Sequence, residues 1–189
     1  MGASVRRTYG DLDRPQVVAA LRTLAGRVGV QRVTMRELAA ELGAAVPSVY
    51  YHVPGKQAAL DLLAESVLAE IRIPEEGRWD ARTTELYCGA REVIISVPGV
   101  AGLLQAGGGG ERARRLDRVS RSLLTEAGLA KADVAAAHAV LYTYLLGSIS
   151  LEESRAVSTG PRAQRLAAAR FRAGLDVVIA GIAAAPRKG

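Results

Sequence analysis

The chain has 189 residues, and 49% of them are hydrophobic, which is enough to bury a core and argues against wholesale disorder. Its formal net charge is +6, with the excess concentrated in the first 57 residues, which hold 8 Lys+Arg against 4 Asp+Glu; a basic balance suits nucleic acid or an anionic membrane and alone distinguishes neither. One cysteine, Cys88, and two histidines exclude an internal disulfide and argue against a zinc site, so we expect no metal and no cofactor.

The N-terminal third is expected to be a small helical head. Residues 1–14 lack the apolar core of a signal peptide, so we expect a cytoplasmic protein. Apolar residues then recur at helical spacing and strand-like alternation is scarce, which predicts an all-α fold. The first helix is expected over 14–28, with Asp13 as its cap. A second helix opens with a capping box from Thr34 to Glu37 and ends at Gly43.

Two further helices are expected before the chain reaches its body, over residues 46–52 and 56–71. Pro74 and Gly77 then mark a hinge. The body is predicted to contain helices over 79–97, 99–105, 111–127, 131–153 and 161–184, joined by loops at 107–110, 128–130 and 154–160. We therefore divide the chain into a head (1–57), a connecting helix and hinge (58–78), and a larger helical body (79–189).

Residues 34–56 have the layout of a helix-turn-helix, whose second helix enters the major groove of DNA. Val49 and Val53, four residues apart, are the natural core anchors of that second helix, and its other side chains are expected to face outward. Small apolar groups suit thymine methyls, while hydroxyls and cations suit base edges and phosphates. The residues expected to contact double-stranded DNA are Thr34, Arg36, Val46, Pro47, Ser48, Tyr50, Tyr51 and Lys56.

Each of these residues also has a purely structural interpretation. Tyr50 and Tyr51 would then pack between helices, and Arg36 and Lys56 would be solvated charges. His52 is expected to be a packed, hydrogen-bonded residue rather than a base reader.

The head motifs resemble those of the tetracycline-repressor (TetR) family of transcriptional regulators. They read TMRELA at 34–39, PSVYYHV at 47–53 and KQAAL at 56–60. Segments of the body resemble the C-terminal domain of the same family, namely residues 79–80, 127–129, 144–147 and 171–176. The resemblance covers nearly the whole chain.

This resemblance implies a homodimer that places two recognition helices on a near-palindromic operator, about 34–36 Å apart. It also implies that a small-molecule effector bound in the body spreads the heads and releases DNA. Ala45 and Val46 depart from the polar residues common at the start of the recognition helix, so the operator sequence does not carry over. The body contains only His138, without a second histidine to share a metal, so tetracycline binding does not carry over either.

The body is expected to hold the effector among the helices from Trp79 to Ala127, although plain core packing is the commoner role for any one of these residues. Arg91 and Glu92 are expected to face solvent. The connecting helix at 56–71 is the natural lever between effector and head, and an effector must favour the form that does not bind DNA. The candidate lining residues are Leu86, Tyr87, Ala90, Leu103, Leu104, Leu116, Val119, Leu123 and Tyr142.

Two helices near the C-terminus are apolar over most of their surface, at 134–151 and 166–184. Each would bury one face in its own subunit and one against a partner, giving a four-helix interface, or both would cover only their own core. Two uncharged runs, 93–110 and 134–151, approach the length of a membrane span. Proline and glycines interrupt the first and polar groups the second, so we expect no membrane.

The sequence leaves two other functions to compare with a ligand-responsive regulator. A helix-turn-helix regulator without a small-molecule effector would act constitutively or through a protein partner, and it predicts a filled body rather than an enclosed apolar cavity. An enzyme is disfavoured because the sequence shows no Ser-His-Asp set, metal cluster or phosphate loop. The glycines at 107–110 precede a helix but lack the lysine and strand of a P-loop.

Overall fold

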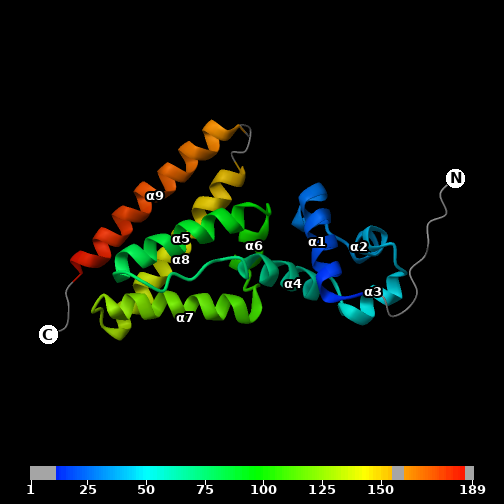
Figure 1. Cartoon of the computed structure of the whole chain (residues 1–189), viewed down its shortest axis with the longest axis horizontal. Helices are drawn as coiled ribbons and strands as arrows, with labels where there is room; N and C mark the ends of the chain where they lie inside the picture. The colour runs from blue at the N-terminus through cyan, green and yellow to red at the C-terminus, as the bar shows by residue number, and fades with distance from the viewer. Residues whose placement is uncertain (1–11, 155–159, 186–189) are drawn as a thin grey trace.

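The computed structural model describes residues 12–154 and 160–185, and this part of the chain contains helices and no strand, which confirms the all-α prediction. The predicted features at 1–11, 155–159 and 186–189 lie outside the described residues. Figure 1 shows an elongated molecule with the N-terminal helices at one end and a helical bundle at the other, joined through the helix over residues 56–68.

The head helices begin and end where local sequence signals place them. Asp13 accepts a hydrogen bond from the Gln16 amide, and the Thr34 hydroxyl accepts one from the Glu37 amide, so each caps the helix that follows it. A short 3₁₀ turn, Val30–Arg32, was not predicted. The three head helices are α1 (Arg14–Val28), α2 (Met35–Leu42) and α3 (Val46–His52).

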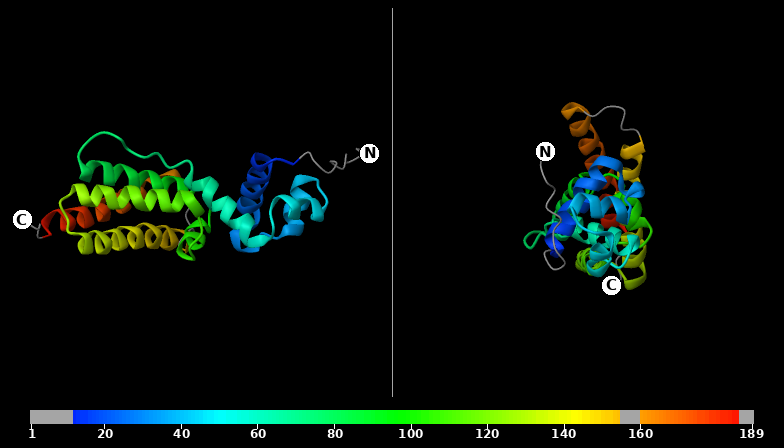
Figure 2. Two further views of the ribbon diagram at one scale, coloured as in Figure 1. Left: turned by 90° about the horizontal axis from the view of Figure 1, so that it is seen from below. Right: turned by 90° about the vertical axis from the view of Figure 1, so that its right-hand side faces the viewer.

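The connecting helix α4 (Lys56–Leu68) ends three residues before its predicted end, at the point where the chain turns toward the body. The left view in Figure 2 shows the body helices lying side by side beyond it. The body consists of α5 (Trp79–Ile95), α6 (Val100–Gln105), α7 (Gly110–Glu126), α8 (Lys131–Ser154) and α9 (Pro161–Ala184).

One apolar core runs from the head through α4 into the body. Leu21, Leu38 and Val49 are fully buried in the head, and Leu63 of α4 is fully buried with them. The far end of α4 packs against α5, α6 and α7. Because α4 also packs against α1, we expect a displacement of its body end to move the head.

A buried ion pair ties three body helices together. Arg91 of α5 donates two hydrogen bonds to Glu152 of α8, at 3.0 and 2.5 Å, and its guanidinium lies 5.6 Å from the ring centroid of Phe171 in α9. Arg91 is buried, so the expectation that it faces solvent is wrong, whereas Glu92 is exposed. A buried arginine requires such a partner, because an unpaired charge is costly to remove from water.

The helices α8 and α9 each leave an apolar face uncovered. Val140 and Leu151 of α8 and Leu166 and Val177 of α9 are exposed, Val177 by 72%. Among the described residues α8 alone is long and apolar enough to cross a membrane, and one third of its most apolar stretch is buried. Length and composition are weak grounds for a span, because a buried or interface helix of a soluble protein satisfies them equally.

Candidate functional site

The first candidate site is the outward face of α3 and its surroundings in the head. The turn between α2 and α3 begins at Gly43, which adopts the left-handed conformation (φ 63°, ψ 28°) that closes α2. Pro47 occupies the first turn of α3, where its missing N–H has no partner to lose. Val49 and Val53 are buried, as predicted, so α3 is held against α2 by its inner edge alone.

Most residues predicted to contact DNA lie on the exposed surface of this head. Tyr51 is 73% exposed and Tyr50 49%, so the alternative that they pack between helices does not describe this structure. Thr34, Arg36, Pro47 and Lys56 are also exposed.

Ser48 is the exception among these residues. Its side chain is 9% exposed, so the expectation that it faces outward is wrong. Ser48 lies about 100° around the helix from Val49, which places it next to the buried edge of α3. Val46 is half-buried against the core and presents only part of its surface.

Two further polar residues of the head are Lys56, whose ammonium group is hydrogen-bonded, and His52, which is exposed. The ammonium group of Lys56, the first residue of α4, donates a hydrogen bond at 2.9 Å to the carbonyl of Gln31 in the 3₁₀ turn. His52 is exposed, not packed as expected, and its ring meets that of Tyr51 edge-on at 5.3 Å. The candidate DNA surface is therefore aromatic at its centre and cationic at its edges.

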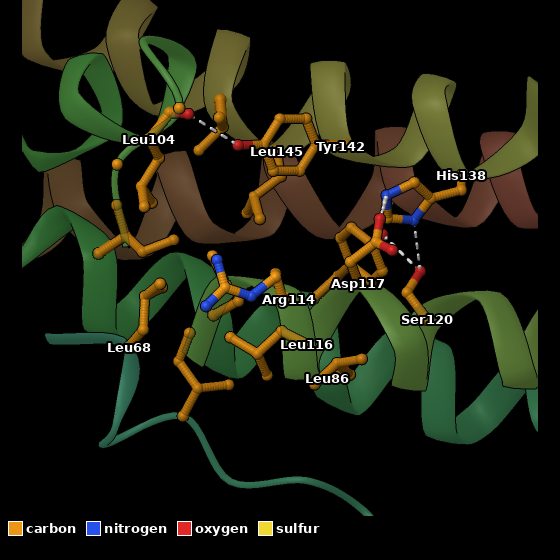
Figure 3. A pocket seen from close by; sticks show the side chains of 18 residues that line it. Leu68, Leu86, Leu104, Arg114, Leu116, Asp117, Ser120, His138, Tyr142 and Leu145 are labelled. Atoms are coloured by element: carbon orange, nitrogen blue, oxygen red, sulfur yellow. Dashed lines mark hydrogen bonds and ion pairs between the residues drawn. The ribbon is translucent and has the colours of Figure 1, made fainter. Parts of the chain in front are cut away.

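The second candidate site is a partly open cavity of about 330 Å³, lined by α4, α5, α6, α7, α8 and the loop before α7. Figure 3 shows apolar side chains over most of its wall, among them Leu68, Leu86 and Leu145. Leu68 and Ile71 come from the end of α4 and the residues just after it, so the connecting segment itself forms part of the wall.

Six of the nine residues predicted to line an effector site lie around this cavity. They are Leu86, Tyr87, Ala90, Leu104, Leu116 and Tyr142. Leu103, Val119 and Leu123 do not line it, which corrects that expectation. Leu103 and Leu123 are buried in the core, and Val119 packs against the core from the side. On α7 the apolar spacing identified the buried face of the helix. It did not identify which residues of that face turn toward the cavity.

A chain of polar side chains crosses the buried end of the cavity. The hydroxyl groups of Tyr87 and Ser120 lie 2.8 Å apart, and Ser120 Oγ lies 3.1 Å from Nδ1 of His138. Nε2 of His138 lies 2.6 Å from Oδ1 of Asp117, as Figure 3 shows. Sequence reasoning missed Ser120, His138 and Asp117 as lining residues. Ser120 lies four positions after Leu116, on the helix face it already indicated, whereas Asp117, one position after Leu116, lies about 100° around α7.

Burial sets the protonation states of this chain. It lowers the pKa of His138, against the attraction of Asp117, so the imidazole is neutral at pH 7. Burial also raises the pKa of Tyr87 to about 12, opposed in part by the hydrogen bond with Ser120. Asp117 is further paired with Arg121, whose Nε lies 2.9 Å from its second oxygen. The four groups thus carry one negative charge, and that charge already has a cation.

The structure brings a serine, a histidine and an aspartate together, which the sequence did not suggest. Ser120 sits within α7, where backbone N–H groups are taken up by carbonyls one turn earlier, so no oxyanion-binding pair of amides faces it. Its hydroxyl is also bonded to Tyr87 and only 3% exposed. This geometry suits recognition of a bound molecule better than acyl transfer.

The glycine-rich loop before α7 brings the body against α4. A Cβ atom on Gly108 would lie 2.9 Å from the Leu103 carbonyl oxygen, and one on Gly110 would lie 3.1 Å from a carboxylate oxygen of Glu65. Gly107 and Gly108 also line the cavity. One loop therefore contacts both the cavity and the helix that carries the head.

Comparison with known proteins finds relatives for both parts of the chain. Residues 17–63 match the family described as bacterial regulatory proteins, tetR family, and residues 73–169 match the tetracyclin repressor-like C-terminal domain. An HTH-type transcriptional regulator of Saccharopolyspora erythraea is 34% identical over 149 residues, which span 77% of this chain and 63% of that protein.

Solved structures share the architecture over nearly the whole chain. BioQ in complex with its natural double-stranded DNA operator is 28% identical with a TM-score of 0.78, and the match covers 93% of this chain and 100% of that one. A variant of TetR from Acinetobacter baumannii AYE in complex with minocycline is also 28% identical with a TM-score of 0.78, over 90% of this chain and 96% of the other.

Proposed function

Because this chain belongs to the TetR family of bacterial regulatory proteins, we propose that it binds a DNA operator through its α2–α3 head and releases that operator when a small molecule occupies the body cavity. The proposal makes it a ligand-responsive transcriptional repressor acting in the cytoplasm. Its relatives are transcriptional regulators rather than enzymes.

The observation that carries this proposal is the continuity between cavity and head. Leu68 and Ile71 form part of the cavity wall, and α4 is packed into the head at its other end. A ligand shifts a conformational equilibrium only through contacts that differ between the two states. A molecule in this cavity would contact the segment that carries Leu68 and Ile71. We propose that this segment takes different positions in the DNA-binding and DNA-free states, because it orients the head. A regulator without an effector would have no use for an open cavity at this position.

The two solved structures bear on the two halves of the proposal. BioQ was crystallised with a double-stranded operator, and the TetR variant with minocycline. By similarity, the exposed α3 of this chain is proposed to enter the major groove, and its cavity to hold an effector. The residues proposed to touch DNA are Thr34, Arg36, Pro47, Tyr50, Tyr51 and Lys56, with a part of Val46.

We further propose that the protein is a homodimer. The uncovered apolar faces of α8 and α9 are adjacent, and Val140 and Val177 line a groove of about 450 Å³ between them. Two copies of this pair would form a four-helix interface and remove these side chains from water. A dimer also presents two heads, which a palindromic operator requires.

The proposed DNA surface is tested with a matched pair of arginine variants. Operators are first selected from random double-stranded DNA with the purified protein, and affinity is then measured by fluorescence anisotropy. Arg36→Ala on the head is expected to weaken operator binding about tenfold or more, because it removes a phosphate or guanine contact. Arg115→Ala, an equally exposed arginine on α7, removes the same charge far from the head and is expected to leave affinity unchanged.

The outcomes of this test are distinct. Equal effects of the two variants would show that net charge rather than the head surface governs binding. Failure to select any DNA would overturn the proposed function. Affinity should also fall steeply with salt, by about 0.9 log unit per neutralised phosphate for each tenfold increase, and a flat salt response would contradict a contact with the DNA backbone.

A further inference from the structure

We propose that the effector is an uncharged, largely apolar alcohol or phenol, whose hydroxyl group donates a hydrogen bond to Tyr87 at the buried end of the cavity. This inference rests on the proposed function and specifies the chemistry of its effector site. It follows from the direction in which the hydrogen bonds of the chain Tyr87–Ser120–His138–Asp117 must run.

The direction is set at Asp117. An ionised carboxylate only accepts hydrogen bonds, so Nε2 of His138, 2.6 Å from Oδ1 of Asp117, carries a hydrogen. In a neutral imidazole the other nitrogen then has none, and Nδ1 accepts a hydrogen bond from the Ser120 hydroxyl at 3.1 Å. Ser120 has thereby used its only hydrogen, so at 2.8 Å it accepts from Tyr87.

Tyr87 therefore lies at the end of this series of hydrogen bonds, and its hydroxyl hydrogen is already donated to Ser120. Its oxygen keeps a lone pair that can accept, and its residue lines the cavity. A ligand group that only accepts, such as an ether or a carbonyl, would place two lone pairs against each other. A hydroxyl group supplies the missing hydrogen, and its own oxygen remains available as an acceptor.

The buried end offers no unpaired charge to a ligand. Asp117 is held by His138 on one oxygen and by Arg121 on the other. Tyr87, Ser120 and His138 are buried and neutral. A charged ligand group placed among them would lose its hydration without gaining a counter-ion, so the group that binds here is uncharged.

The other residues that line the cavity indicate the polarity and size of the rest of the ligand. The hydroxyl of Tyr142 is occupied by the Leu104 carbonyl at 3.0 Å, and Arg114 is paired with Glu111. The remaining lining is mostly leucine, isoleucine and alanine. A cavity of about 330 Å³ lies at the small end of the range of roughly 300–1,000 Å³ known for ligand sites, which suits a compound of one to three rings.

Three naphthalenes that differ in one group provide the test, with binding to the full chain measured by calorimetry at pH 7.5. 2-Naphthol donates a hydrogen bond, 2-methoxynaphthalene only accepts, and 2-naphthoate is an anion. The expected order places 2-naphthol about tenfold tighter than either of the others, which is the scale of one buried neutral hydrogen bond.

Two tyrosine variants identify the atom responsible. Tyr87→Phe is expected to abolish the preference for 2-naphthol over 2-methoxynaphthalene. Tyr144→Phe deletes the same atom on α8, where the hydroxyl donates to the Phe171 carbonyl outside the cavity lining, and is expected to keep the preference. Circular dichroism confirms that both variants are folded.

Each alternative outcome overturns the inference. Equal affinities for 2-naphthol and its methyl ether, tighter binding of 2-naphthoate, no binding of 2-naphthol up to its solubility, or a preference that survives Tyr87→Phe would each do so. Operator binding is measured on the same preparation. Operator binding without a response to 2-naphthol rejects this effector class alone, whereas loss of all DNA binding rejects the proposed function.

Discussion

Gly109 lies so close to Leu68 that a Cβ atom on the glycine would come within 2.8 Å of Leu68 Cδ1. Gly109 precedes α7 in the body, and Leu68 is the last residue of α4. The connecting helix is thus seated on bare backbone of the body. This contact lies beside the cavity, which Leu68 also lines. A molecule in the cavity would therefore influence the orientation of the head through Leu68 and α4.

Two alanine substitutions in the loop before α7 distinguish the effect of steric contact on stability from the effect of backbone conformation. Gly109→Ala and Gly107→Ala both force a side chain into positive φ, at 98° and 90°, but only Gly109 has neighbours within 4 Å. We expect Gly109→Ala to be less stable than Gly107→Ala by about 1–3 kcal/mol in urea denaturation, and to bind operator more weakly because α4 is displaced. In a double-mutant cycle, Gly109→Ala should cost less stability in a Leu68→Ala background than in the parent, because the neighbour at 2.8 Å has been removed. Equal stability of the two single variants would show that the close contact has no energetic effect.

The buried His138 predicts a pH dependence of stability. Burial lowers the pKa of His138 in the folded state below its ordinary value of 6.5, so the unfolded chain binds this proton more readily. The contribution of His138 to stability is therefore full above about pH 6.5 and is lost as the pH falls toward the folded pKa. The charged or titratable groups facing it are Asp117 and Arg121 on α7, Tyr87 on α5 and Tyr142 on its own helix.

Glutamine variants of the two histidines isolate this effect. His138→Gln keeps an N–H donor near Asp117 but does not titrate, so its unfolding free energy should fall less between pH 7.5 and 5.5 than that of the parent. His52→Gln replaces an exposed histidine and should retain the full dependence. A parent-like pH profile in His138→Gln would contradict the assignment.

The buried ion pair of Arg91 should matter more than the exposed pairs on α7. Arg91→Ala leaves Glu152, only 23% exposed at its side chain, without its cation. We expect a loss of about 2–4 kcal/mol in unfolding free energy. Arg118→Ala breaks an exposed pair with Glu111 and should leave the unfolding free energy nearly unchanged, because water and salt screen such a pair. Similar losses in the two variants, measured by chemical denaturation, would argue against a special role for burial.

Helix boundaries were predictable because their signals are local. Asp13, Thr34 and Gly43 cap the helices that their own neighbours form, and the bond partners lie within four residues. The outward aromatic face of α3 was also predictable, since Val49 and Val53 define its buried edge by spacing alone.

The features that the sequence did not predict depend on contacts between residues that are far apart in the chain. Whether Ser48 turns inward depends on how α3 crosses α2, and whether Arg91 is solvated depends on Glu152, 61 positions away. The polar chain at the cavity joins α5, α7 and α8, and no spacing within one helix reveals that Tyr87, Ser120 and His138 meet. Conversely, Leu123 has the correct period to line a cavity but is covered by its neighbours.

The apolar faces of α8 and α9 give a final prediction, about assembly. Val177→Glu places a charge in the groove that Val177 shares with Val140, where a second copy would have to bury it. We expect the variant to sediment as a folded monomer and to lose operator affinity, because a single head engages only one half-site. Ala183→Glu is the matched control, since Ala183 lies seven residues after Asp176, on the polar face that also carries Arg172. It should remain dimeric and bind operator normally. A dimeric Val177→Glu protein, or equal dissociation of both variants, would place the interface elsewhere.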